Sequence, residues 1–299
     1  MKIFVTGATG FIGRNLILSL KQRHYQIMAF VLSGDNEAVK IAQDNPEISY
    51  GDIRDKGSIE KAIAGADAVI HLAAIQESND PALNEEINYI GVKNLVETCR
   101  KYSIKRLIHL SSISTCYKVK SHYGTSKAKA DQYLMSSFGI DYTILRPTLV
   151  YGNTASGPFH TFLQILDKLP LVIPVIGNGR ALKQPVFVED VVSAIILALE
   201  TDAAIGKYYD ISGQNAVTIE EIIRQIMAKR GRKKMLVKIP VWMLYPLALV
   251  LEKVSTCPVF TRESLGSATQ DATLDHGLIK KELGYCPVSF SEGLAKINL

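Results

Sequence analysis

Tyr123 and Lys127 have the side chains and the spacing that proton transfer to a substrate oxygen requires. They lie four residues apart in a segment with helical character, so both side chains would share one face of a helix. A free tyrosine titrates at about pH 10, and a neighbouring ammonium would favour the tyrosinate and lower that pKa. We therefore expect Tyr123 to act as the acid or base and Lys127 to tune it.

The same spacing occurs a second time, at Tyr89 and Lys93, so the pair alone is not decisive. Position separates the two occurrences. Tyr123 opens a predicted helix directly after a strand and a serine-rich segment, 110–114, whereas Tyr89 lies in the middle of a predicted helix. We expect a structural role for Tyr89.

The segment 6–13, with the sequence TGATGFIG, joins a predicted strand to a predicted helix. Gly7 would permit a tight turn, Gly10 would let a diphosphate approach the backbone, and Gly13 would let the helix pack closely. The unpaired N–H groups at the start of that helix would bind phosphates. This context predicts a dinucleotide site; the alternative is a turn selected only for packing.

Strand-like and helix-like segments alternate through the first half of the chain. The predicted strands are 2–6, 26–32, 48–50, 68–72, 107–110 and 142–145, and the predicted helices are 11–20, 57–64, 81–102 and 123–138. Such alternation is typical of βαβ units around a parallel sheet. We expect an α/β fold, a Rossmann-type doubly wound parallel sheet with right-handed crossovers.

The alternation weakens after Pro147, where the chain becomes richer in proline. Further predicted helices are 189–200 and 218–229, and further predicted strands are 207–211 and 236–239. We assign residues 1–150 to a Rossmann domain and residues 151–299 to a smaller C-terminal substrate lobe beside the carboxyl ends of the sheet. An alternative is that the second half also contributes elements to the Rossmann domain.

The composition is that of a globular protein. With 47% hydrophobic and 21% charged residues among 299, disordered and low-complexity classes are excluded. The net charge of +5 is concentrated in segment 229–238, so a role in coating nucleic acid is not expected. Neither the four cysteines nor the histidines, His71 and His109 included, have metal-ligand spacing, which predicts no metal site. Met1 and Lys2 lead directly into the first predicted strand, so we expect no signal peptide and a cytoplasmic protein with free thiols.

Several motifs together resemble the short-chain dehydrogenase/reductase superfamily, in its extended or atypical branch, the NAD-dependent epimerase/dehydratase family. The motifs are TGATGFIG (6–13), GDIRD (51–55), HLAA (71–74), Asn88 before Gly91, LSSIS (110–114), YGTSK (123–127), ILRPTLVYG (144–152), QPVFVEDVV (184–192) and LGYCP (283–287). The resemblance covers nearly the whole chain and extends to the nucleotide-binding accessory subunit of respiratory complex I and to sterol dehydrogenases. It specifies the superfamily far better than the substrate.

The resemblance implies site residues for this chain. The implied cofactor-binding residues are Gly7, Thr9, Gly10, Phe11, Ile12, Gly13, Arg14, Asp52, Ile53, Leu72, Ala73, Ala74, Asn88, Ser111, Tyr123, Lys127, Arg146 and Pro147. Asp52 is expected to hydrogen-bond the adenine, and Arg146 with Pro147 to flank the nicotinamide. The implied catalytic residues are Tyr123 and Lys127. For the third catalytic position Ser112, Ser114 and Thr115 are the alternatives, and of these we select Ser112 to orient the substrate oxygen. Ile113 stands where the family places Ser or Thr, and the short loop 117–123 also departs from nucleotide-sugar epimerases.

The cofactor is expected to be NAD(P)(H), with NADP slightly favoured. An NAD site usually has an acid about twenty residues beyond the glycines, at the end of the second strand. Segment 30–34 contains neither an acid nor an arginine, and Asp35 comes slightly late. Arg14 is placed to reach a 2′-phosphate, although a solvated helix position is an equal alternative.

Three functional hypotheses follow from these residues. The first is an oxidoreductase of an alcohol or carbonyl substrate, with an epimerase or dehydratase using the same hydride step internally. The second is a non-catalytic cofactor-binding sensor or assembly factor, which Ile113 favours. The third is a membrane-associated dehydrogenase of a lipid-like substrate.

Segment 229–238 and the apolar, aromatic stretch 239–251 bear on the third hypothesis, because such a pairing suits an anionic membrane surface. A solvated turn before a buried helix, or a lid over an apolar substrate, is the alternative. Partners are expected to be a small molecule, which includes nucleotide sugars, ketones and lipid-like compounds, and a second copy in a homodimer.

Overall fold

The computed structural model describes residues 1–299 except 45, 77, 154–156, 247–264 and 267–268. Contacts divide the chain into two compact units. Unit 1 consists of Met1–Pro147, Val188–Ile211 and Asp275–Cys286, and unit 2 consists of Thr148–Phe187, Ser212–Leu274 and Pro287–Leu299. The chain therefore enters each unit more than once. The assignment of cofactor binding to residues 1–150 and of substrate binding to residues 151–299 stays a prediction.

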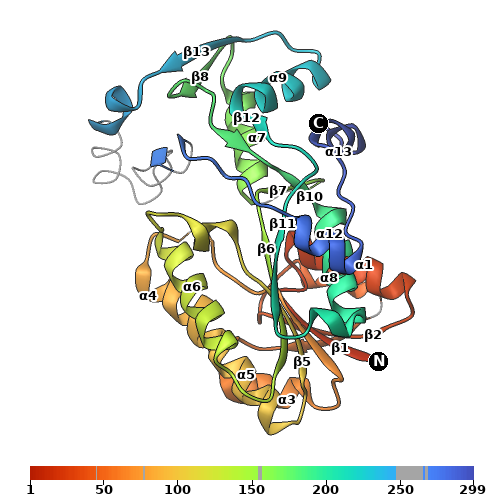
Figure 1. Ribbon diagram of the computed structural model, residues 1–299. Helices are drawn as coiled ribbons and strands as arrows, with labels where there is room; N and C mark the ends of the chain where they lie inside the picture. The colour runs from red at the N-terminus through yellow and green to blue at the C-terminus, as the bar shows by residue number, and fades with distance from the viewer. Residues whose placement is uncertain (45, 77, 154–156, 247–264, 267–268) are drawn as a thin grey trace. The chain divides into compact units, whose positions relative to one another are not determined.

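The described residues of unit 1 form a seven-stranded parallel sheet with the order β11-β6-β5-β4-β1-β2-β3 (Figure 1). The strands are β1 (Lys2–Thr6), β2 (Gln26–Val31), β3 (Glu47–Tyr50), β4 (Ala68–His71), β5 (Arg106–Leu110), β6 (Asp141–Pro147) and β11 (Lys207–Ile211). The chain winds outward from β1 in one direction and then returns to wind in the other. The predicted doubly wound Rossmann-type fold is confirmed.

Helices cover both faces of this sheet (Figure 1). On one face α3, α5 and α6 pack side by side, and on the other α1 packs against α8. The helices of unit 1 are α1 (Phe11–Gln22), α2 (Ala38–Ala42), α3 (Lys56–Ile63), α4 (Pro81–Asn84), α5 (Gly91–Lys101), α6 (His122–Met135), α8 (Val188–Glu200) and α12 (Gly277–Leu283). Because both faces are covered, strands such as β1 and β4 are buried along nearly their whole length.

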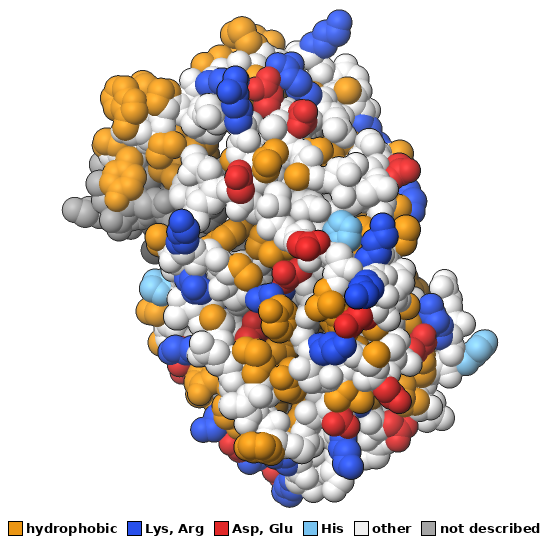
Figure 2. All heavy atoms as spheres, viewed as in Figure 1, with side chains coloured by type: hydrophobic (Ala, Val, Ile, Leu, Met, Phe, Trp, Pro, Cys, Tyr) orange, Lys and Arg blue, Asp and Glu red, His pale blue; other side chains and the backbone are white. Residues whose placement is uncertain are grey.

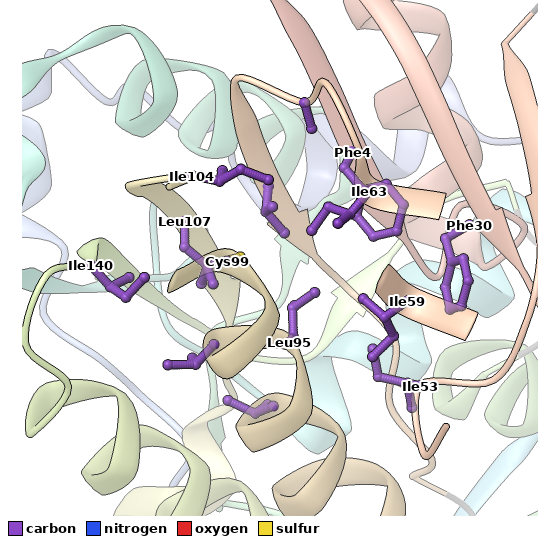
Figure 3. Close-up of a cluster of buried hydrophobic side chains, with 14 of the residues drawn as sticks. Phe4, Phe30, Ile53, Ile59, Ile63, Leu95, Cys99, Ile104, Leu107 and Ile140 are labelled. Carbon is purple, nitrogen blue, oxygen red and sulfur yellow. The ribbon is translucent and has the colours of Figure 1, made fainter. Parts of the chain in front are cut away.

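A cluster of buried hydrophobic side chains joins the sheet to α3 and α5 (Figure 3). Phe4 of β1 and Phe30 of β2 contact each other with ring centroids 5.4 Å apart. Ile63 of α3 and Leu95 of α5 are completely buried in the same cluster. Burying an aliphatic or aromatic side chain of this size contributes about 1.5–3 kcal/mol. The cluster therefore holds the strands, and the loops at their carboxyl ends, on a rigid base.

The predicted helix 81–102 is interrupted. It consists of α4, a π-helical turn η1 (Glu85–Ile90) and α5. Within η1 the Asn88 side chain accepts from the Ile75 N–H and donates to the Ile75 carbonyl, both at 2.9 Å. Hydrophobic spacing does not distinguish a π turn from an α-helix, so the sequence pattern could not predict this interruption.

Unit 2 contains shorter elements. They are β7 (Val150–Tyr151), α7 (Pro158–Lys168), β8 (Val172–Ile176), β9 (Leu182–Lys183), β10 (Val186–Phe187), β12 (Val217–Thr218), α9 (Ile219–Lys229), β13 (Met235–Ile239) and α13 (Phe290–Lys296). Its strands pair two by two: β10 with β7, β12 with β9 and β13 with β8. The sequence analysis predicted none of the two-residue strands β7, β9, β10 and β12, which are too short for a periodic pattern.

Candidate functional site

The glycine turn fits closely against the loop that follows β4. Gly7 has a φ of +69°, and a methyl group at its Cα would lie 2.7 Å from the Ala73 nitrogen. A methyl group on Gly13 would lie 2.2 Å from the Gly7 carbonyl oxygen, so Gly13 packs α1 onto the turn itself. No side chain could occupy either position without moving the backbone. The turn is therefore fixed in a shape that only glycine permits.

The first turn of α1 is left open for an anion. Gly10 is the N-cap, and no side chain accepts a hydrogen bond from the first N–H groups of this helix. The first turn of the helix, which begins at Phe11, also contains no acidic residue. An uncapped helix start carries partial positive charge and unpaired donors, which suits a diphosphate.

A pocket of about 380 Å³ lies beside this turn, at the carboxyl ends of β1, β2 and β4. It is lined by Gly7, Thr9, Gly10, Phe30, Leu32, Asp35, Gly51, Asp52, Ile53, Arg54, Leu72, Ala73, Ala74, Ile75 and Ile87. Eight predicted cofactor residues are thus brought together: Gly7, Thr9, Gly10, Asp52, Ile53, Leu72, Ala73 and Ala74. The apolar side chains suit a flat aromatic base, and the narrow glycine end suits phosphates, so the pocket fits the adenosine part of a dinucleotide.

Two acids that follow β2 take positions that the sequence analysis did not assign. Asp35 lines the pocket and accepts a hydrogen bond of 2.7 Å from the Thr9 hydroxyl. Glu37 forms an ion pair of 2.5 Å with Arg14, which does not line the pocket. The signal for Asp35 was present in the sequence. It was discounted because the turn after β2 places the acid a few residues later than the usual pattern.

Asp52 lies in the pocket wall but already has a partner. Its carboxylate accepts from Arg54 at 2.6 Å, and this hydrogen bond lowers the pKa of Asp52. Ile53 next to it is buried, and a methyl group on Gly91 would lie 2.9 Å from its side chain. The close approach of α5 therefore fixes the loop that carries Asp52.

Other predicted cofactor residues are engaged within unit 1. Asn88 connects the Ile75 backbone to the Ser126 hydroxyl of α6, at 2.9 Å and 3.1 Å. Arg146 pairs with Asp210 at 2.8 Å, and its guanidinium lies 4.3 Å from the centre of the Tyr208 ring. These contacts hold β6 to β11 and the loop after β4 to α6.

Ser112 is brought to Tyr123 by the start of α6. The Ser121 hydroxyl caps this helix by accepting from the Gly124 N–H at 2.9 Å. A methyl group on Gly124 would lie 2.7 Å from the Ser114 carbonyl, so α6 approaches the 3₁₀ turn η2 (Ile113–Cys116) closely. In this arrangement the Ser112 hydroxyl accepts from the Ser114 hydroxyl at 3.0 Å, and Ser112 acts to lower the pKa of Tyr123.

Burial dominates the pKa of Tyr123. It raises the pKa to about 12, although the hydrogen bond with Ser112 acts in the opposite direction. The expectation that the Lys127 ammonium lowers this pKa is therefore not met in the chain alone. Removal from water disfavours the tyrosinate more than its neighbours favour it.

Lys127 is 1% exposed, on the same helix as Tyr123. Its ammonium donates to the Leu110 carbonyl at 2.5 Å and lies 3.3 Å from Nε2 of His109. Burial lowers the pKa of Lys127 to about 8, while the charge of Asp131 acts to raise it. Ser111, a predicted cofactor residue, donates to Asp131 at 2.6 Å instead.

The second tyrosine–lysine pair has a different environment. Tyr89 packs partly buried against the hydrophobic cluster and contacts Tyr133 edge-on, with centroids 6.2 Å apart. These contacts fit the structural role expected for Tyr89. In the described ranges, no group of His, Cys, Asp and Glu has the geometry of a metal site, and Cys99, Cys116 and Cys286 are free thiols.

Residues 3–212 match the sequence profile of the NAD dependent epimerase/dehydratase family. The chain belongs to this family. The resemblance drawn from the sequence motifs is confirmed, and with it the expectation of an NAD-dependent enzyme of the epimerase, dehydratase or dehydrogenase type.

Relatives of this family member include both kinds that the motifs suggested. It is 29% identical to sterol-4-alpha-carboxylate 3-dehydrogenase, decarboxylating, of Mus musculus, over 84% of this chain and 74% of that protein. It is 26% identical to the mitochondrial NADH dehydrogenase (ubiquinone) 1 alpha subcomplex subunit 9 of Dictyostelium discoideum, over 98% and 83%. Among solved structures, UDP-glucose 4-epimerase of Thermotoga maritima with UDP-glucose superimposes with a TM-score of 0.80, at 25% identity and over 99% and 97% of the two chains.

Proposed function

We propose that this chain binds NAD(H) and oxidises a secondary alcohol or reduces the corresponding ketone, with Tyr123 as the proton-transfer residue. The observation that carries the proposal is the placement of Tyr123 and Lys127 on the first turns of α6, packed against the Ser112 turn directly after β5, one strand away from the pocket-lining end of β4. Carboxyl ends of neighbouring strands in a parallel sheet form the usual ligand site of this architecture.

The chain's own residues would divide the work as follows. A bound nicotinamide supplies or accepts the hydride. Ser112 orients the substrate oxygen by hydrogen bonding, and Tyr123 donates a proton to that oxygen or takes one from it. Lys127 presents an ammonium on the same helix face. The glycine turn and the start of α1 hold the diphosphate.

We propose that NAD(H) is preferred to NADP(H), against the slight preference expected from Arg14. The Asp35 carboxylate lines the pocket, and a 2′-phosphate beside it would meet like charge. Arg14, the residue that favoured NADP, is neutralised by Glu37. An acid that accepts from the ribose hydroxyls is the usual determinant of NAD binding.

Tyr123→Phe tests the proposed chemistry. Turnover with a panel of ketones, secondary alcohols and nucleotide sugars should fall at least about a hundredfold, which is the usual contribution of a general acid or base. Cofactor binding, measured by NADH fluorescence, should remain. Tyr89→Phe is the matched control and should retain turnover. Full turnover in Tyr123→Phe would exclude the mechanism.

A second candidate is a non-catalytic cofactor-binding protein, and two observations favour it. Ile113 replaces a hydroxyl side chain, and burial raises the pKa of Tyr123 to about 12. The similarity to a complex I subunit of Dictyostelium discoideum is consistent with it. Cofactor binding without turnover on any member of the panel, in both the parent and Tyr123→Phe, would support this candidate instead.

The basic segment 229–238 has acidic partners in unit 2. Arg230 and Arg232 both pair with Asp167, at 2.8 Å and 2.9 Å, and Lys238 pairs with Glu220 at 3.1 Å. Figure 2 shows basic and acidic side chains side by side over this part of unit 2. Such pairing favours a structural role for the segment over attraction to an anionic membrane.

The apolar stretch 239–251 stays an untested prediction as a membrane contact or lid. Trp242 is 74% exposed, and residues 247–251 lie outside the described residues. None of the helices in the described ranges combines the length and hydropathy that crossing a bilayer needs. Co-sedimentation with anionic vesicles, compared between the parent and Trp242→Ala, measures the contact. The expected homodimer also stays a prediction, and analytical ultracentrifugation of the chain measures its oligomeric state.

A further inference from the structure

A row of buried polar side chains lies behind Lys127, and the proposed function uses none of it. His71 at the end of β4, His109 in β5 and Asp131 in α6 are 1%, 0% and 7% exposed. Buried polar atoms normally have partners, because removal from water without a new hydrogen bond is destabilising. Here three such atoms have no hydrogen-bond partner: His71 Nε2, His109 Nδ1 and Asp131 Oδ1.

His109 lies between a cation and an anion. Its Nε2 is 3.3 Å from Nζ of Lys127 and 3.4 Å from Oδ1 of Asp131. In a neutral imidazole one nitrogen is a donor and the other is an acceptor. Nε2 can therefore accept from Lys127 or donate to Asp131, but it cannot do both at once.

The imidazole is neutral at physiological pH, so the choice between these two contacts is a choice of tautomer. Burial lowers the pKa of His109 to about 4, and Lys127 contributes in the same direction. The groups that face this site come from three elements. His71 stacks on His109 with centroids 5.2 Å apart and has a pKa well below its usual value, and Tyr123 is neutral because burial raises its pKa. Lys127 and Asp131 remain as the groups that carry charge.

Lys127 can change its charge within an accessible pH range. The tautomer of His109 can therefore respond to pH. Burial lowers its pKa to about 8. As an ammonium, Lys127 needs acceptors, and the Leu110 carbonyl and His109 Nε2 supply two. As an amine it no longer requires Nε2 as an acceptor, and Nε2–H is then free to donate to the unpaired Oδ1 of Asp131.

We propose that His109 is a tautomeric switch that couples the charge of Lys127 to Asp131, and that His109 and Asp131 are positioning residues for proton transfer at Tyr123. In the switching step Lys127 changes from ammonium to amine, Nε2 gains a proton and Nδ1 loses one, so the site gives up one proton to solvent overall. The switch itself stands on the contacts of the ligand-free chain. Its role in catalysis rests on the proposed function.

The switch is tested directly in the unmodified, cofactor-free chain. Nitrogen-15 spectra of the histidine rings are recorded from about pH 6 to about pH 10, a range that brackets the pKa of Lys127. We expect His109 Nε2 to be unprotonated below the titration midpoint of Lys127 and protonated above it. His109→Gln assigns the signal. A single tautomer of His109 across the whole titration would overturn the proposal.

The coupling to Asp131 is tested with a charge-removing variant. Selective carbon-13 labelling of lysine Cε follows the titration of Lys127, which Lys127→Met assigns. In Asp131→Asn the midpoint should fall by about one pH unit, because the anion that favours the ammonium is gone. Asp131→Glu should restore most of the lost shift in the Lys127 midpoint. Asp44→Asn, which removes a surface ion pair with Lys21, should leave that midpoint unchanged. An unshifted midpoint in a folded Asp131→Asn variant would overturn the coupling.

The pH profile of turnover separates this inference from the proposed function. If the chain turns over a substrate, the part of the pH–rate profile that follows the titration of Lys127 should move in Asp131→Asn. It should move in the same direction as the Lys127 midpoint measured by carbon-13 spectroscopy. A shifted midpoint with an unshifted pH–rate profile would remove the positioning role. If no substrate is turned over, the proposed function fails, and the two spectroscopic experiments still decide the switch.

Discussion

At the residue scale, we propose that one acid after β2, Asp35, sets the preference of the pocket for NAD(H) over NADP(H). Asp35 reaches the pocket wall through its hydrogen bond with Thr9, and Arg14 is held away by Glu37. Charge on Asp35 opposes a 2′-phosphate and offers an acceptor to ribose hydroxyls.

Asp35→Asn should therefore reduce the preference for NADH over NADPH. Hydrogen bonds to charged groups contribute about 1.5–3 kcal/mol, so the ratio of dissociation constants should change about tenfold or more. Calorimetry with both coenzymes measures this ratio, and Asp44→Asn serves as the surface control. Tighter binding of NADPH than of NADH by the parent chain would contradict the assignment.

The lowered pKa values of the buried His71 and His109 predict how stability responds to acid. His109 has a folded pKa of about 4 and an unfolded value of about 6.5. Between those values the unfolded chain binds more protons than the folded chain, so stability falls as the pH falls through this window.

In His109→Gln the free energy of unfolding should depend less steeply on pH between about 6.5 and about 4. A residual slope is expected from His71, whose pKa is lowered in the same direction. Urea denaturation at a series of pH values measures it. An equally steep dependence in the variant would show that His109 is protonated in the folded chain.

At the element scale, the turn between β1 and α1 depends on backbone contacts that leave no room for a side chain. Gly13 packs against the Gly7 carbonyl, and no flexible side chain is present there to move aside. Overpacking of this kind costs about 1–3 kcal/mol.

Gly13→Ala should lower the free energy of unfolding by about that amount and also weaken NADH binding, because the turn must shift. Gly57→Ala is the matched control. Gly57 lies in the first turn of α3, where the nearest atom to an added methyl group is the Asp55 carboxylate at 3.3 Å. Unchanged cofactor affinity in a destabilised Gly13→Ala variant would separate the turn from the binding site.

The same scale shows what local patterns can predict. The spacing of apolar residues located the strands of unit 1 to within a few residues, because the central strands, such as β1 and β4, are buried on both faces and flanked by turns. The predicted helix 81–102 was wrong at the π turn, because the contact of Asn88 with Ile75 joins residues thirteen positions apart and leaves no periodic trace. The contacts of Asp131 were missed for the same reason, since its partners Ser111 and His109 lie on β5 and the loop after it.

At the scale of the whole molecule, the alternating elements of the first half predicted the fold, and motifs along nearly the whole chain predicted the family, while the substrate stayed open. The glycine turn, the Tyr123 helix and the motif at 51–55 act within unit 1, where neighbouring strands bring them together. Unit 2 is built from short strands and from segments that return late in the chain, so pattern and spacing carry less information there.

The central claim of the account is that the glycine turn holds the diphosphate of a nicotinamide dinucleotide. Calorimetric titration of the folded chain with NADH and with NAD⁺ tests it most directly. The account predicts saturable binding of one dinucleotide per chain, weakened in Gly13→Ala. A folded chain that binds neither form of NAD and neither form of NADP at about millimolar concentration, where binding free energies fall to about −4 kcal/mol, would contradict it.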